Sequence, residues 1–574
     1  MMKKITMALL AIMFLGNTAF AGGILTNTNQ SVNFLRNPAR DAAIGLDGVY
    51  SNPAGVAFLS DGLHLGFNWQ YAHQTRTITS TNPLFALGAK NNGLTTKEFE
   101  GVANAPFIPS LQAAYNKNNW SFQFNFSVPG GGGKCEFDKG IGSFETVVGS
   151  IASLLKDKSE EINNKFFQLN QSLQNFPVQL LDASVPNVTG YDVDGYMKGQ
   201  QYYFGFQLGV ARKINEHLSV YAGLRLLYGT ASYEARLNNI RVMNGSESMT
   251  LPDYFMGVNN GFNNAGKNVA TCSQFVKDNI QTVNNAINQY VAAFMDQGMT
   301  QEQAMQHPLV NQLVEQGNKL KAIGESLQVK GQELQENGQK LADKAEMLAP
   351  YANGMNLKSD QSGWGIAPVL GIDYKIGNFN FAAKYEFKTR MRMKNDSDLK
   401  EATVISAMNK YVNGTSVPED SPALLALGAQ WEMTPGVRLN LGYHHFFDKS
   451  AHWYEHSEKL LDGDTNEYLA GAEWDVTKKL QVSGGVQLTR YGLSDAYMND
   501  MSFVVNSWTF GLGVGYQVTD KVKVNAAYFQ TNYENYDMNM PEQNMSGLGL
   551  TIPEGKNSFT RTNRVVGLGV EVTI

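Results

Sequence analysis

Apolar and polar residues alternate with a period of two along much of the chain. From Trp120 to Val128 every even position is aromatic or aliphatic, whereas the odd positions carry serine, glutamine or asparagine. Each such segment has one apolar and one polar face, which predicts a half-exposed β-strand. The alternation predicts fourteen strands, at 63–77, 107–115, 120–128, 201–212, 218–235, 364–376, 379–394, 422–433, 437–447, 467–475, 480–493, 507–518, 522–534 and 562–574.

The connections between these strands alternate between short turns and long loops. Outer-membrane barrels have this rhythm, with short periplasmic turns and longer extracellular loops. The sequence therefore predicts an all-β transmembrane protein, a 14-stranded antiparallel outer-membrane β-barrel over residues 63–574. Four aromatic residues that lie shortly before short turns predict an interfacial girdle: Tyr374, Trp431, Trp474 and Tyr516.

Composition supports the barrel and excludes other classes of protein. Only 17% of the 574 residues are charged, glycine occurs 56 times, and the mean hydropathy is -0.28. Past the N-terminus no uncharged apolar run reaches the roughly 18 residues that a spanning helix needs, which excludes a bundle of transmembrane helices. A net charge of -6 without a long basic run excludes nucleic acid as a partner.

The N-terminus has the features of a secretory signal peptide. Lys3 and Lys4 precede an apolar stretch at 7–15, and a small-residue cleavage motif lies at 19–21. We expect residues 1–21 to be removed on export. Export together with the predicted barrel places the chain in the outer membrane of a Gram-negative bacterium. The alternative is a buried N-terminal helix.

Four stretches of the chain carry a family resemblance. They read SNPAG at 51–55, GIAPVLGI at 365–372, AKYEFKT at 383–389 and PALLALG at 422–428. Together with export and fourteen strands, they resemble the FadL family of outer-membrane long-chain fatty acid transporters. The resemblance implies that residues 22–62 form a hatch inside the barrel. It also implies that hydrophobic substrate leaves sideways into the membrane beside an inward-kinked strand.

The residues of this N-terminal segment suit an irregular plug. A fourteen-stranded barrel has a lumen too wide for its own side chains to fill, so another part of the chain must occupy it. Phe34, Leu35 and Ala54 supply apolar groups, while Pro53 fixes its own backbone and holds Asn52 extended. The alternative is an extension on the barrel surface, where these apolar residues would be exposed to water.

Two long inserts, at 129–200 and 236–362, have helical periodicity. In the second insert, leucines from Leu313 to Leu348 and glycines from Gly317 to Gly338 repeat every seven residues. A seven-residue repeat predicts supercoiling against a partner helix, with the glycines where the two helices approach closely. We expect an extracellular helical bundle, which either only packs or also offers a ligand groove. The glycines at 130–133 are expected to form a flexible exit into the first insert.

A fatty acid carboxylate in an apolar lumen needs a cationic partner. Alternation along the seventh strand places Lys388, Arg390 and Arg392 on its inward face, and Arg225 and Arg438 have inward parity on their own strands. These five cations are the predicted ligand-binding residues. The alternative is that they are solvated charges at the extracellular mouth. The arginine that the family has near the end of the fifth strand is replaced here by Leu-Tyr-Gly-Thr.

The histidines and the two cysteines are the remaining candidates for chemistry. His444, His445, His452 and His456 cluster with carboxylates, a set that could bind a metal, but their spacing matches no closed site. Loop residues without a metal are the favoured interpretation. Ser450 near His445 lacks a nucleophile-elbow context, so no catalytic residue, enzyme activity or cofactor is expected.

The only two cysteines, Cys135 and Cys272, both fall on the predicted extracellular side. The oxidising periplasm favours a disulfide between the two inserts. The alternative is two separate thiols buried as small apolar residues.

The sequence as a whole predicts an outer-membrane channel for hydrophobic small molecules, above all long-chain fatty acids, that works without chemistry. Its partners would be that ligand and outer-membrane lipid or lipopolysaccharide, around a monomeric barrel. The alternative is a surface adhesion or structural protein, in which the helical crown binds a macromolecule and the barrel only anchors it.

Overall fold

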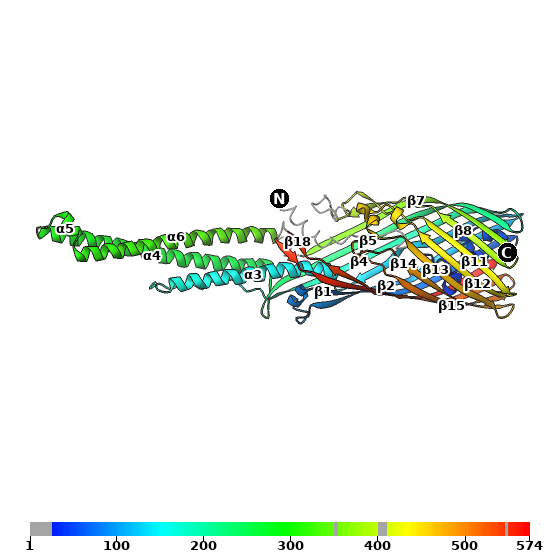
Figure 1. Cartoon of the computed structure of the whole chain (residues 1–574), viewed down its shortest axis with the longest axis horizontal. Coiled ribbons are helices and arrows are strands. Elements are labelled where there is room, and N and C mark those ends of the chain that lie inside the picture. Colours follow the sequence, from blue (N-terminus) through cyan, green and yellow to red (C-terminus); the bar gives the residue numbers. More distant parts are fainter. Residues whose placement is uncertain (1–25, 349–353, 400–409, 502, 546–548) are drawn as a thin grey trace.

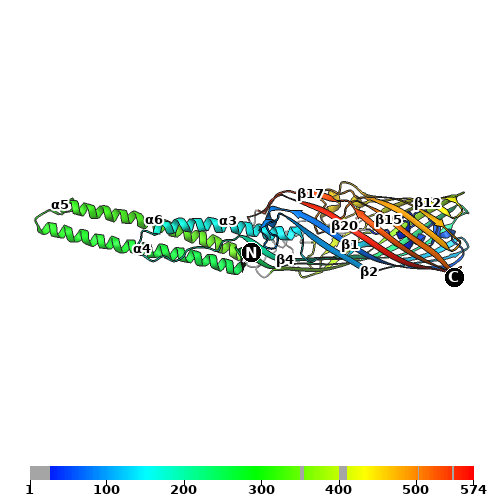
Figure 2. The same ribbon diagram turned by 90° about the horizontal axis from the view of Figure 1, so that it is seen from below.

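The computed structural model describes residues 26–348, 354–399, 410–501, 503–545 and 549–574. Its strands close into an antiparallel barrel, and a helical extension projects from one end of the barrel (Figures 1 and 2). The predicted signal peptide, residues 1–21, lies outside the described residues.

The barrel wall follows the order of the sequence, because each wall strand pairs with the next. The last strand, β20 (Gly555–Thr573), pairs with the first, β1 (Gly62–Thr81), and closes the ring. The predicted fourteen-stranded antiparallel barrel is confirmed. The other twelve wall strands are β2 (Thr96–Lys117), β3 (Trp120–Phe137), β4 (Gly190–Lys213), β5 (Leu218–Asn244), β7 (Met355–Ile376), β8 (Phe379–Glu386), β11 (Leu424–Thr434), β12 (Val437–Phe446), β13 (Thr465–Asp475), β14 (Leu480–Arg490), β15 (Ser507–Thr519) and β16 (Val522–Tyr533).

Several wall strands extend far beyond their predicted ends on the helical side of the barrel. β4 and β5 have 24 and 27 residues, so the first insert is much shorter than the predicted 129–200. In these extensions the outward residues are polar, for example Lys358 and Asp360, and apolar residues such as Leu357 face inward, so the lipid-facing apolar pattern used for the prediction ends early. Shorter strands on this side are β6 (Glu247–Thr250), β9 (Arg392–Ser397), β10 (Ser416–Pro418), β17 (Tyr536–Met540), β18 (Gln543–Met545) and β19 (Leu550–Ile552).

The outer surface of the wall is apolar below these extensions. On β7, Trp364, Ile366 and Leu370 face outward and are 68%, 53% and 47% exposed, whereas Ala367 and Val369 face inward and are fully buried. The aromatic residues predicted to form a girdle are exposed on the outer surface close to the short turns: Tyr374, Trp431, Trp474 and Tyr516.

The helices lie beyond the barrel mouth. α4 (Leu251–Asp296) and α6 (Pro308–Leu348) form an antiparallel hairpin, connected through the short α5 (Gln301–Met305). Among the helices of the described ranges, none is long and apolar enough to cross a membrane.

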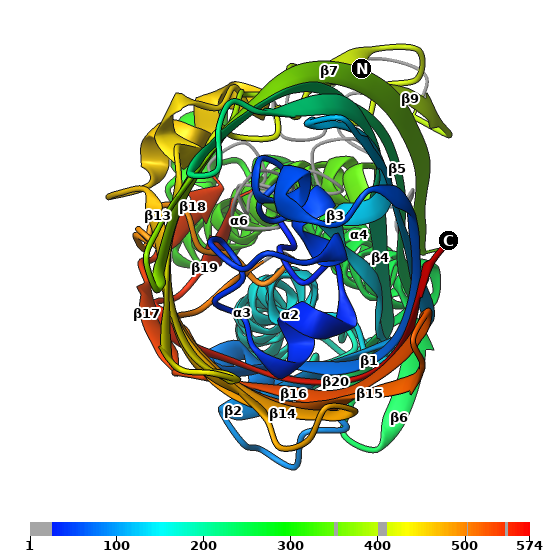
Figure 3. The same cartoon turned by 90° about the vertical axis from the view of Figure 1, so that its right-hand side faces the viewer.

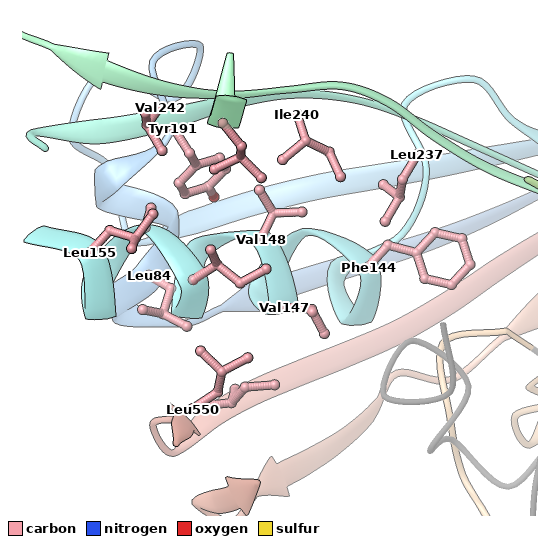
Figure 4. Close-up of a cluster of buried hydrophobic side chains, with 14 of the residues drawn as sticks. Leu84, Phe144, Val147, Val148, Leu155, Tyr191, Leu237, Ile240, Val242 and Leu550 are labelled. Carbon is pink, nitrogen blue, oxygen red and sulfur yellow. The ribbon is translucent and has the colours of Figure 1, made fainter. Parts of the chain in front are cut away.

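α3 (Gly142–Leu173) begins inside the barrel mouth and connects the helices to the wall. Figure 4 shows Val148 and Phe144 of this helix beside Tyr191 and Leu237 of the long strands, with Val147 on the other side of the helix. Further along, Phe166 contacts α4, where its ring meets that of Phe262 edge-on at 5.0 Å. α3 therefore braces the base of the α4–α6 hairpin.

Glycines of α6 face valines of α4 at regular intervals. A β-carbon built on Gly317, Gly324 or Gly331 would lie 3.5 to 3.7 Å from a valine methyl group of α4. The prediction that these glycines mark close approach to a second helix is confirmed. The distances are ordinary van der Waals contacts, so each position has room for one methyl group and no more.

Replacing Gly324 with alanine should therefore stabilise the hairpin. The new methyl group fits against Val276, and alanine favours the helix by about 1 kcal/mol over glycine. Hydrogen exchange of the α6 amides should become slower. Gly324→Leu should have the opposite effect, because its larger side chain pushes the helices apart. Equal exchange rates in the two variants would contradict the close packing.

Candidate functional site

Residues 26–61 lie inside the barrel, as Figure 3 shows from the short-turn end. This segment, called the hatch below, contains three short helices. They are α2 (Val32–Arg36), η2 (Leu46–Val49) and η3 (Gly55–Phe58). Short turns pair part of the hatch backbone within the segment, and several of its carbonyls find partners outside it.

Inward-facing side chains of the wall supply these partners. Gln123 donates to the Pro53 carbonyl at 2.7 Å, and Ser219 donates to the Ala54 carbonyl at 2.6 Å. Buried polar backbone groups need such partners, so the polar inner face of the wall holds the hatch in one position. Equivalent bonds run from Ser110, Asn116, Asn380 and Lys384 to the carbonyls of Gln30, Val56, Ala42 and Tyr50.

Asn52 fixes the turn that the sequence singled out. Its amide nitrogen donates to Asp373 of β7 at 2.6 Å, and its amide oxygen accepts from the Gly55 backbone at 3.2 Å. A β-carbon on Gly55 would lie 2.4 Å from the Asn52 amide, so this position has no room for a side chain. The predicted hatch residues Phe34, Leu35, Asn52, Pro53 and Ala54 are all buried.

Arg40 is the main charged contact between hatch and wall. Its guanidinium pairs with Asp47 of the hatch at 2.8 Å and with Glu473 of β13 at 2.6 Å. Burial alone would raise the pKa of Asp47, but the Arg40 guanidinium holds it below its usual value. Asp47 therefore stays ionised, and the three side chains form a buried ionic network that ties the hatch to the wall.

Two of the predicted ligand-binding cations belong to this hatch–wall contact. Arg438 pairs with Asp475 at 2.8 Å and with Glu473. Arg225 pairs with Glu386 and lies over the ring of Tyr50, with 4.8 Å between the guanidinium carbon and the ring centroid. Both arginines face inward as expected, but their guanidinium groups are already paired with carboxylates of the protein.

The inward orientation predicted for Arg390 and Arg392 is wrong. The seventh strand breaks after Glu386 and resumes at Arg392 as β9, and the break reverses which face each residue presents. Met391 and Met393 are fully buried, whereas Arg390 and Arg392 are exposed. Lys388 is half-buried and donates to the Ser450 carbonyl at 2.7 Å.

The wall is interrupted between β2 and β3. These strands pair from Lys117 and Trp120 as far as Leu111 and Phe126, and above that point they meet again only at Val102 and Glu136. Residues 103–110 and 127–135 therefore have no ladder bonds to each other. Prolines, which cannot donate a ladder bond, lie on both sides of the interruption: Pro106, Pro109 and Pro129.

The glycines at 130–133 form a bulge in β3 at this point, not the flexible exit that the sequence predicted. Gly131 and Gly133 have φ values of 100° and 69°, which glycine tolerates best. At the bulge, the start of the hatch takes the place of β2 as the hydrogen-bonding partner of β3. Asn27 donates its backbone N–H to the Pro129 carbonyl at 2.9 Å, and Gln30 bonds both backbone groups of Val128.

A cavity of about 170 Å³ lies beside the interruption. The hatch, the unpaired parts of β2 and β3 and the opposite wall all contribute to its lining. Apolar contributions come from Phe34, Ala105, Ile108, Val128 and Phe529. None of the five predicted ligand-binding cations lines this cavity.

Arg561 is a cation of the cavity lining that the sequence analysis did not select. Its guanidinium nitrogens lie 3.3 Å from Gln74 Oε1 and 3.4 Å from the Phe503 carbonyl, and its guanidinium carbon lies 5.1 Å from the Tyr533 ring centroid. These partners are neutral. Arg561 directly precedes the predicted last strand, and β20 extends past it.

The structure does not bring the four histidines of 444–456 together in one cluster. His444 faces the lumen, where it lies 2.9 Å from Asp41 of the hatch and 2.8 Å from Glu467, which lines the cavity. His445 faces outward and packs against Phe447, while His452 and His456 stack on each other in the next loop. His444 is a further hatch–wall contact.

The predicted disulfide is wrong, because both cysteines are free and buried. Cys135 lies in the wall strand β3, where its sulfur packs against Gly101. Cys272 lies in α4, about 30 Å along the helix from its first residue at 1.5 Å per residue.

A second cavity, called the mouth chamber below, lies at the helical end of the barrel. It has a volume of about 340 Å³ and is lined by Phe85, Met498, Met538 and Ile552 among others. On β20, Asn557 lines the mouth chamber and Arg561 lines the lower cavity. The buried ring of Phe559 lies between these two residues, 4.9 Å from the ring of Phe503.

Comparison with solved structures identifies the type of barrel. A FadL homologue of Pseudomonas aeruginosa matches with a TM-score of 0.52 and 12% identity, over 96% of this chain and 99% of that chain. The toluene transporter TodX of P. putida matches with a TM-score of 0.43 and 12% identity, over 92% and 94% of the two chains. No family model and no curated protein matches this chain. The fold is therefore FadL-type, as the resemblance implied.

Replacing Arg40 with methionine should loosen the hatch. The change leaves the buried carboxylates Asp47 and Glu473 without their shared cation, and breaking a buried pair from one side costs about 3 to 5 kcal/mol. Planar-bilayer recordings should show frequent opening steps that are rare in the wild type. Arg241→Met, the same change at an exposed position of β5, is the control. A closed baseline in both variants would show that Arg40 does not hold the hatch.

Proposed function

We propose that this protein is an outer-membrane channel that takes up hydrophobic small molecules and releases them sideways into the membrane. The interruption between β2 and β3, next to the 170 Å³ cavity, is the observation that carries the proposal. A molecule in that cavity lies close to the surrounding lipid, whereas the hatch obstructs the path along the barrel axis.

The outer surface of the barrel supports placement in the outer membrane. A closed barrel satisfies its backbone hydrogen bonds within the wall, which lipid requires. Its outward side chains are apolar, and a surface of this size would be unfavourable in water. The predicted signal peptide, residues 1–21, would direct export.

The two cavities define the proposed route. A ligand enters the mouth chamber, passes Phe503 and Phe559, and reaches the lower cavity beside the interruption. Both rings are buried, so their side chains must rotate to let the ligand pass. Transfer from water to lipid gains about 25 cal/mol for each Å² of apolar surface that leaves water. Release into the membrane therefore needs no chemical energy.

Arg561 favours long-chain fatty acids as the ligand. It is a cation in the cavity lining whose hydrogen-bonding partners are neutral, so it can receive a carboxylate. The hydrocarbon chain would extend through the route towards the mouth chamber.

The size of the lower cavity favours compact neutral ligands as a second candidate class. At about 170 Å³ it is close to the apolar cavity of ~150 Å³ that holds benzene in another protein. The two classes differ in their need for Arg561, so one substitution separates them.

The tip of the α4–α6 hairpin favours a second candidate function, adhesion. Tyr290, Met295, Met305 and Leu309 are 42% to 48% exposed there, and such apolar groups are typical of contact surfaces. In that function the barrel is only an anchor. Uptake that depends on the interruption between β2 and β3 would favour the channel.

Filling the interruption should block uptake. Ala105 lines the cavity from the unpaired part of β2, so Ala105→Trp should occlude the exit. Uptake of a hydrophobic fluorescent probe into cells should fall at least about tenfold. Ala113→Trp, at a paired position of the same strand, is the control and should transport normally. Normal uptake by both correctly folded variants would contradict sideways release.

Replacing Arg561 with glutamine should weaken binding of a fatty acid but not of its methyl ester. Only the acid loses a charge-assisted contact of roughly 1.5 to 3 kcal/mol, which is about 10- to 100-fold in Kd. Arg564→Gln, an exposed position of the same strand, is the control for titrations of both ligands. Equal losses for acid and ester would show that Arg561 does not bind the carboxylate, and no loss for either would favour the compact neutral class.

A further inference from the structure

The break in the seventh strand places a row of cations on the outside of the barrel. Between β8 and β9 the chain forms an isolated β-bridge from Thr389 to Ser421, and the Glu419 backbone N–H donates to the Met391 carbonyl. Above the break Met391 and Met393 are buried in the barrel. The side chains that alternate with them face outward and are exposed: Arg390, Arg392 and Lys394.

The apolar outer surface next to this row has the height of a membrane. On β7 the outward residues are apolar from Ile376 up to Trp364, and the next ones are Ser362 and Asp360. Twelve steps of about 3.3 Å give ~40 Å of strand. At the tilt of ~35–45° that such barrels have, this strand spans about 30 Å of height, close to the apolar band expected for an outer-membrane barrel. Trp364 therefore lies at the upper edge of the band.

The cation row lies at this same edge. Lys394 pairs with Ser362 of β7, and the carbonyl oxygens of Arg392 and Arg390 lie against Gly363 and Gly365. The two arginines are therefore level with Trp364 and Ile366. Phe387, just below the row, is 40% exposed on the outer surface.

No other side chain of the described residues forms an ion pair or hydrogen bond with the side chains of this row. Asp396 and Asp360 lie about two residues further from the band, at roughly 7 Å along the strands. Lys388, in contrast, is held by Ser450 and Asp420. Three like charges side by side repel one another unless an anion neutralises them.

We propose that Arg390, Arg392 and Lys394 bind the phosphate groups of a phosphorylated glycolipid in the outer leaflet. Guanidinium groups match phosphate oxygens in a two-pronged geometry, and cations beside a membrane attract anionic headgroups. The exposed Trp364 and Phe387 would pack against the acyl chains of the same lipid. This site rests on the proposed placement in the outer membrane, and it is independent of which molecule the channel carries.

The full-length protein in detergent micelles can be titrated with bisphosphorylated lipid A, and the bound lipid counted by native mass spectrometry. The triple variant R390A/R392A/K394A should bind this lipid at least about tenfold more weakly than the wild type. Lipid A without phosphate groups should bind both proteins equally. The control K375A/K478A/K521A removes three exposed cations near the short-turn end and should bind like the wild type.

Equal binding of the phosphorylated lipid to the wild type and the triple variant would overturn the proposal. Equal loss of both lipids would also overturn it, because phosphate would then not be recognised. The single variant Arg392→Gln, with an intermediate loss expected, keeps the test valid if the triple variant folds poorly. Uptake measured in the same variants separates this site from the channel, since A105W should lose uptake and keep lipid binding.

Discussion

The hatch and the barrel wall depend on each other through hydrogen bonds. Residues 26–61 lie in a lumen, yet they contain only short helices and turns, and several of their carbonyls bond to the wall. Each polar group left buried without a partner costs about 1 to 3 kcal/mol, so the inner face of the wall must be polar at the height of the hatch. The outer face must be apolar to contact lipid. These two requirements together produce the period-two pattern of the sequence.

The sequence predicts the fold best where a strand needs both a polar inner face towards the hatch and an apolar outer face towards lipid. The strand at 120–128 alternates cleanly because it has lipid on one side and the hatch on the other. Beyond the lipid the outward residues are polar and the apolar residues, such as Leu237, face inward, so the pattern that marks a lipid-facing strand ends before the strand does. Arg561 lies one residue outside the predicted last strand for this reason. Arg390 and Arg392 were assigned inward because alternation assumes an unbroken strand, and five residues outside the ladder reverse the parity. The interruption between β2 and β3 depends on which residues of the two strands pair with each other. The apolar and polar pattern of a single strand does not contain that information.

The helical hairpin was predictable for a different reason. Its packing repeats every seven residues within a single helix, so the glycines of α6 show the contact without knowledge of the partner. The valines of α4 that face them, Val269, Val276 and Val283, follow the same step. The predicted disulfide is wrong because it depends on the distance between two segments that are far apart in the chain. The pattern of residues within either segment does not contain that distance. Local repeats are therefore visible in a sequence, whereas the relative placement of elements is not.

The first residues of the hatch are part of the plug and also part of the hydrogen bonding of the barrel wall. Asn27 and Gln30 belong to the plug, and through their bonds to Pro129 and Val128 they also replace the missing neighbour of β3. Displacing this segment would unpair the wall and lift one end of the plug in the same movement. In the proposed function, opening the side exit would therefore also loosen the axial seal. A barrel built this way would not widen the proposed exit without weakening the plug in its lumen.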